Sequence, residues 1–312
     1  MINFRYHIVS LVAVFMALAI GIVVGATILG DRINEGIVAQ AAQDRKELQL
    51  QRAEVLRLND LLKYQNDYAE KVAKPISDQL LRDQTVAIVT MPGAPRSVVN
   101  SVSAAVTDAG GVVTATAEVR SNTFDPDRAA DTDAVVKAFA DRVTFQPNDT
   151  TATKVGRLIA RALLAHEPLT RDPVADDIIK GLADGKLVST NTDGNLRARV
   201  VVVVTAPALD PRPEAEVLAA HVQLEVALKG ETAGAVAAVV AGPNSEDVEG
   251  TDVASVRADA IATEALSTVD VADLPSGVTT VVLAAKEQLL GRQGHYGAAP
   301  SRDDVAPKIP VQ

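Results

Sequence analysis

Cysteine and tryptophan are both missing from the 312 residues, and aromatic side chains make up only 3% of the chain. Without cysteine the chain can form no disulfide and can offer no thiolate nucleophile or thiolate metal ligand. The methionines Met1, Met16 and Met91 are widely separated, and no HxH, HxxxH or MxxM pattern occurs. We therefore predict that the chain has no metal site of its own.

Basic residues are also scarce relative to acidic ones. Lysine and arginine number 30, aspartate and glutamate number 40, and the formal net charge is −10. Nucleic-acid binding needs a concentrated basic face, and here no run of Lys or Arg exceeds two residues. We exclude nucleic acid as a partner.

Motifs for catalysis and cofactor binding are absent as well. The sequence has no GxGxxG, no GxxxxGK[ST] and no GxSxG. The turn Pro92-Gly93-Ala94-Pro95 holds two prolines, which lack the N–H groups that a phosphate needs. His166 and His221 fall in helical stretches, where we interpret them as surface or groove imidazoles. We predict no catalytic and no cofactor-binding residue, and a protein that is not an enzyme.

A long apolar run near the start is the clearest positive feature. Residues 8–29 carry no charged side chain, and 22 residues of helix span about 33 Å, the thickness of a bilayer core. The apolar region of a cleaved signal peptide is shorter, so we favour a retained anchor over residues 1–30. The flanking charges do not decide its orientation. Small residues recur every four positions in it, at Ala13, Ala17, Gly21 and Gly25, and predict a face for helix packing.

Residues 31–83 have the composition of a helical stalk. Leu48, Val55 and Leu62 are spaced by seven, and Leu58 and Val72 occupy the second seam position, where glutamine stands at 51, 65 and 79. This pattern predicts a coiled coil, with a helix over 30–74 about 67 Å long that kinks or ends at Pro75. The alternative is an amphipathic helix lying on the chain's own domain. The partner of the seam, another protein or a second copy in a homodimer, stays open.

Residues 84–296 alternate short apolar strands with helical stretches, which predicts an open, mostly parallel, doubly wound α/β domain of Rossmann-like type. A run of valines at 200–204 is typical of a strand covered on both faces. We expect strands at 86–90, 112–119, 200–205, 235–241 and 278–283. We expect helices at 97–109, 134–145, 153–166, 174–183, 213–228, 254–263 and 284–290. Residues 297–312, rich in proline, alanine and charge, predict a disordered tail.

Two segments resemble a known family. The opening, from Met1 through Gly25, resembles that of the actinobacterial MctB/SteB family, and Ser267 to Asp270 with Gly294-His295-Tyr296-Gly297 is similar to its close. The resemblance spans essentially the whole chain. It implies an extracytoplasmic α/β domain and two roles: copper export or homeostasis, and cell separation with a SteA-like membrane partner that controls a peptidoglycan hydrolase.

The residues favour the second role. An anchor, a spacer and a domain without metal ligands suit a non-catalytic cell-envelope protein that works through contacts of its coiled coil. We therefore expect a single-pass protein of the cell membrane, N-terminus cytoplasmic, that acts in cell separation. The alternative is a copper-homeostasis protein. Within the sequence, only His295 and Tyr296 support this alternative.

Overall fold

The computed structural model describes residues 4–230, 234–245 and 248–308, except that the side chains of residue 4 and residues 27–39 are not described. The chain divides into two units, residues 1–65 and 66–312. Helix α1, Phe4–Ser77, accounts for the anchor and most of the predicted stalk. Pro75 lies in its last turn, and left-handed backbone at Gln79 and Asp83 marks the turns that lead into the sheet.

The second unit is built on one seven-stranded sheet with the order β3-β2-β1-β4-β5-β6-β7. Neighbouring strands run parallel except β3, which is antiparallel to β2. The strands are β1 Thr85–Thr90, β2 Val112–Val119, β3 Val188–Thr192, β4 Val200–Val204, β5 Ala237–Ala241, β6 Ser267–Val269 and β7 His295–Tyr296. The order reverses between β1 and β4, and this confirms the predicted doubly wound, mostly parallel α/β fold.

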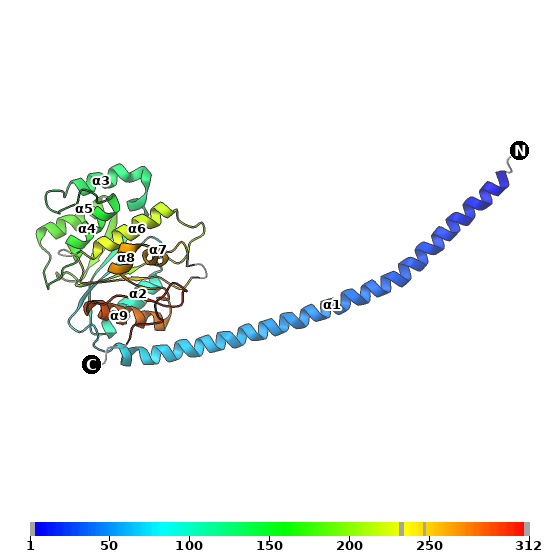
Figure 1. Ribbon diagram of the computed structural model, residues 1–312, viewed down its shortest axis with the longest axis horizontal. Coiled ribbons are helices and arrows are strands. Elements are labelled where there is room, and N and C mark those ends of the chain that lie inside the picture. The colour runs from blue at the N-terminus through cyan, green and yellow to red at the C-terminus, as the bar shows by residue number, and fades with distance from the viewer. Residues whose placement is uncertain (1–3, 231–233, 246–247, 309–312) are drawn as a thin grey trace. The chain divides into compact units, whose positions relative to one another are not determined.

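Helices cover both faces of the sheet (Figure 1). One layer holds α2 and α9, and the other holds α4, α5 and α6. The helices and 3-10 turns of this unit are α2 Arg96–Asp108, η1 Ser121–Phe124, η2 Pro126–Arg128, α3 Ala129–Lys137, α4 Thr151–Leu163, α5 Pro173–Asp184, α6 Ala215–Leu228, α7 Asp252–Ala258, α8 Ala260–Ala265 and α9 Pro275–Leu289.

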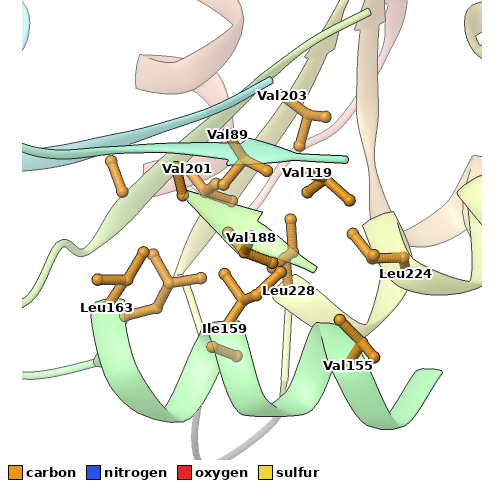
Figure 2. Packing of buried hydrophobic residues seen from close by; sticks show 14 of the residues in the cluster. Val89, Val119, Val155, Ile159, Leu163, Val188, Val201, Val203, Leu224 and Leu228 are labelled. Carbon is orange, nitrogen blue, oxygen red and sulfur yellow. The ribbon is translucent and has the colours of Figure 1, made fainter. Parts of the chain in front are cut away.

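Strand β4 shows why the valine run is buried throughout. Val200, Val202 and Val204 face α2 and α9, whereas Val201 and Val203 face α4 and α6. In Figure 2, Val201 and Val203 lie in the same apolar cluster as side chains of α4 and α6. A strand covered on both sides needs apolar residues at successive positions, so its sequence does not alternate.

Our prediction of a strand at 278–283 is wrong, because these residues lie inside helix α9. Pro275 occupies the first turn, where its missing N–H costs nothing. The hydroxyls of Thr279 and Thr280 donate to the carbonyls of Pro275 and Ser276, one turn back. The β-branched residues predicted a strand, but packing of the helix against β5 and β6 prevails over that propensity.

Two predicted helices have different bounds. The segment expected to be helical at 254–263 is split at Asp259, whose side chain accepts hydrogen bonds from the N–H groups of Ile261 and Ala262 and so caps α8. The helix expected at 134–145 begins earlier and ends at Lys137. The remaining predicted helices match α2, α4, α5 and α6 within a few residues at each end.

The tail that we expected to be disordered is held against the sheet at several points between residues 297 and 308. Ala299 and Pro307 are buried, and Asp303 N–H donates to the carbonyl of His295. The prediction failed because it used composition alone, whereas these residues complete the sheet edge at β7. The last residues of the predicted tail, 309–312, lie outside the described residues.

Candidate functional site

At the carboxyl ends of β1 and β4, where doubly wound sheets commonly bind ligands, the turns that follow the two strands pack against each other. An open hollow of about 500 Å³ remains beside them, with Leu209, Arg212 and Asn244 in its lining. Gly93 adopts a φ of +83°, and a β-carbon there would lie 3.2 Å from Cβ of Ala206 and 3.9 Å from the Leu209 side chain. The adjacent hollow, between Gly242 and Asp270, measures about 10 Å³, roughly the space of one water molecule.

The C-terminal segment is held by a group of residues that we call the C-terminal clasp: Arg257, Asp270 and residues 294–297. Arg257 and Asp270 form an ion pair of 2.8 Å with side chains only 3% and 5% exposed. Arg257 also donates to Thr268 Oγ1 at 2.7 Å and to the Tyr296 carbonyl at 2.8 Å. Asp270 accepts from the N–H groups of Ala298 and Ala299. The buried charges are thus paired and hydrogen-bonded on both sides.

His295 is committed within the clasp. Its Nε2 lies 2.6 Å from Thr263 Oγ1 and its Nδ1 lies 3.0 Å from Thr268 Oγ1. Burial lowers the pKa of this imidazole, which favours the neutral ring. Tyr296 donates its hydroxyl to Glu287, and burial raises the pKa of the phenol. His295 and Tyr296, the two residues that could have indicated copper binding, therefore form hydrogen bonds within the protein.

The two glycines of the Gly294–Gly297 motif allow the backbone to approach neighbouring side chains closely. A β-carbon at 294 would lie 2.2 Å from Tyr296 Oη, and one at 297 would lie 2.1 Å from Asp270 Oδ1. Gly297 also has a φ of +132°, which side chains rarely tolerate. The motif that carries the family resemblance is therefore explained by the packing of the last strand.

Side chains that could bind a metal ion do not cluster among the described residues. Among them no group of three or more His, Asp or Glu side chains is arranged to hold a metal ion. A copper site made of several protein ligands would need such a cluster of imidazole or other donors, since thiolates are missing from the whole chain.

One buried polar cluster was missed at the sequence level. His221 and Glu225 lie one turn apart on α6, and His221 Nδ1 lies 2.8 Å from Asp252 Oδ1. Glu225 is fully buried, and among the described residues neither of its carboxylate oxygens has a hydrogen-bond partner. Burial, with the nearby Asp252 charge second, raises the pKa of Glu225 well above its usual value.

Our interpretation of His221 as a surface or groove imidazole is wrong, because the residue is only 7% exposed. Phe124 of η1 packs on its ring at 4.3 Å between centroids. A weak signal was present in the sequence, since Glu225 interrupts the apolar residues Val222, Leu224 and Val226.

The predicted seam of α1 is exposed in its N-terminal half. Leu48, Val55, Leu58 and Leu62 are 47%, 55%, 43% and 55% exposed, whereas Val72, in the second unit, is half-buried. Other apolar side chains on the same helix, Leu50 and Leu56 among them, are also exposed but lie off the seam. The structure therefore places these residues on one helix and leaves their partner open.

The anchor prediction has a direct counterpart. Residues Arg5–Ala26 form a helical segment with a mean hydropathy of 2.8, long and apolar enough to cross a membrane, and none of it is buried. Ala13, Ala17, Gly21 and Gly25 all lie in it, and a β-carbon at either glycine would meet no atom within 4 Å.

A family model described as "Copper transport outer membrane protein, MctB" matches residues 1–307. The chain belongs to the MctB family. Its relatives include the protein named Copper transporter MctB in Mycobacterium tuberculosis, 27% identical over 95% of this chain and 96% of the relative. The protein of the same name in Mycobacterium leprae is 26% identical with the same coverage. The family model covers helix α1 and the α/β domain alike.

Proposed function

We propose that this chain is a membrane-anchored protein of copper homeostasis that acts through protein contacts of α1. Membership of the MctB family along nearly the whole chain is the observation that supports the copper role. The relatives are named copper transporters, and this name comes to the chain here as a proposal.

The chemistry of the described residues favours an indirect role over copper carriage by the α/β domain. His295 and Tyr296 are taken up by hydrogen bonds to Thr263, Thr268 and Glu287. A single apolar helix also cannot line a pore by itself. The chain would then support a partner that handles copper, and the anchor would hold it beside that partner.

The contact surface that we propose is the seam formed by Leu48, Val55, Leu58 and Leu62. Burying side chains of this size stabilises an interface by roughly 1.5–3 kcal/mol each. A second copy is one candidate partner, since anchored helices share a direction and a parallel pair would place Glu47 of one copy near Arg52 of the other. The small-residue ladder of the anchor offers a further contact within the membrane.

Copper titration of the full chain in nonionic detergent tests the indirect mechanism. We expect wild type and His295→Ala to bind Cu²⁺ equally and more weakly than about micromolar, because the imidazole is buried and bonded. Saturable binding well below micromolar that His295→Ala removes would overturn the indirect role and assign copper to the clasp.

A second candidate is control of cell separation with a SteA-like membrane partner and a peptidoglycan hydrolase. The exposed seam favours it as much as it favours copper homeostasis, because both need a partner-facing helix. Deleting the gene separates the two candidates. Copper sensitivity with normal septation supports the first, and chained cells with normal copper tolerance support the second.

A further inference from the structure

A groove of about 870 Å³ lies along α4 and α6 and gathers cations in a chain of net charge −10. Its lining includes Arg142, Thr153, Arg157, Arg161, Gln223 and Lys229. Among the described residues, Asp259 is the acidic side chain that lines it. The described lining therefore carries four basic side chains and one acidic side chain, an arrangement that attracts anions.

Helix geometry sets the spacing of the donors. Thr153, Arg157 and Arg161 follow each other at intervals of four residues, so they share one face of α4, with about 6 Å between successive side chains along the axis. Helix α6 forms the opposite wall. The two helices approach closely at Gly156, where a β-carbon would lie only 2.7 Å from the Leu224 carbonyl oxygen. The two arginines are therefore presented from a fixed, closely packed helix pair.

The three arginines of the groove have N–H donors that their ion pairs do not use. Arg142 pairs with Asp177 at 2.7 Å, Arg157 with Asp149 at 2.7 Å and Arg161 with Asp172 at 2.7 Å. These contacts use one or two of the five N–H donors that each guanidinium carries. Arg142, Arg157 and Arg161 line the groove, whereas their three acidic partners do not.

Positive charge is in excess around the groove. Asp172 is shared between Arg161 and Arg197, the latter at 3.1 Å. Lys229 donates its Nζ to the Ala265 carbonyl at 2.6 Å and to Gln288 Oε1 at 2.9 Å, and both acceptors are neutral. A ligand with acid groups would neutralise the remaining positive charge.

We propose that the groove binds a small polyanion that carries two or more phosphate or carboxylate groups. Arg157 and Arg161 would hold two acid groups about one helical turn apart, and Arg142 would extend the contact. Guanidinium suits this task because it binds such oxyanions with parallel N–H bonds. The inference does not depend on the copper role.

Isothermal titration of the full chain in nonionic detergent, with tripolyphosphate and with citrate, tests the proposal. Ile261 lines the groove and is 72% exposed, so Ile261→Glu adds a carboxylate there and Ile261→Gln is its uncharged match. Arg142→Gln removes a cation whose ion pair is exposed, so folding should tolerate it.

Saturable binding of either anion is expected. We expect about tenfold weaker binding for Ile261→Glu, about threefold weaker for Arg142→Gln, and a change within about twofold for Ile261→Gln. Tighter binding of tripolyphosphate would assign the groove to phosphates, and tighter binding of citrate would assign it to carboxylates. No saturable binding of either anion, or equal losses in the Glu and Gln variants, would overturn the proposal.

Discussion

Gly297 lies so close to Asp270 that a β-carbon at position 297 would stand 2.1 Å from the carboxylate oxygen Oδ1. The same carboxylate holds Arg257 at 2.8 Å and accepts two backbone N–H groups from the segment that follows Gly297. The small size of Gly297 therefore allows the C-terminal segment to form its hydrogen bonds with Asp270.

Gly297→Ala should destabilise the fold by about 2–4 kcal/mol, because a β-carbon both clashes with Asp270 and occupies a strained φ. Chemical unfolding followed by circular dichroism measures the loss. Gly291→Ala is the matched control, since Gly291 has a φ of +79° but a β-carbon there meets nothing within 4 Å. The control should lose about 1 kcal/mol, and equal losses in the two variants would refute the role of the close approach.

Glu225→Gln should flatten the pH dependence of stability. Burial raises the folded-state pKa of this acid, so the folded state holds a proton that the unfolded state releases. Stability is therefore undiminished below the unfolded pKa of about 4.3 and falls, by up to about 1.4 kcal/mol per pH unit, as pH rises toward the folded pKa. Unfolding between pH 5 and 8 should show the variant gaining on wild type as pH rises. A constant difference across that range would contradict a buried, protonated Glu225.

Asp172→Asn should have the opposite pH profile. The guanidinium of Arg161 lowers the pKa of Asp172 to about 2, so this carboxylate stabilises the fold above its unfolded pKa, and the gain is lost as pH falls toward 2. The side chain is 45% exposed, so solvent screening limits the loss in the variant to about 1 kcal/mol at pH 7. Asparagine can still cap α5, so the helix should remain. Thermal unfolding at pH 7 and pH 2.5 checks the pattern, which an undiminished loss at pH 2.5 would contradict.

The features that could be predicted from sequence are those with long, regular patterns. The uncharged run of the anchor and the valines of β4 show plainly in the residues, and they led to the correct fold class. Strands β6 and β7 have only three and two residues, too few for a period to appear. Thr279 and Thr280 favoured a strand, although their hydroxyls bond within a helix turn.

The candidate site was harder to predict because its contacts join distant positions. Arg257 meets residues of β6, β7 and the following segment, and His221 meets Asp252, which lies 31 residues later. Spacing along the chain does not show such pairs. The heptad residues of α1 share one helix face whatever they bind, and their role in a coiled coil stays a prediction.

The most direct test is copper tolerance of a gene-deletion strain that carries stalk variants. Leu48→Asp, Val55→Asp and Leu62→Asp together place charge on the seam, and Leu50→Asp with Leu56→Asp places charge on exposed leucines off the seam. We predict that the off-seam variant restores wild-type tolerance and that the seam variant, at equal membrane abundance, does not. Full copper tolerance with the seam variant would contradict a role that depends on protein contacts of α1.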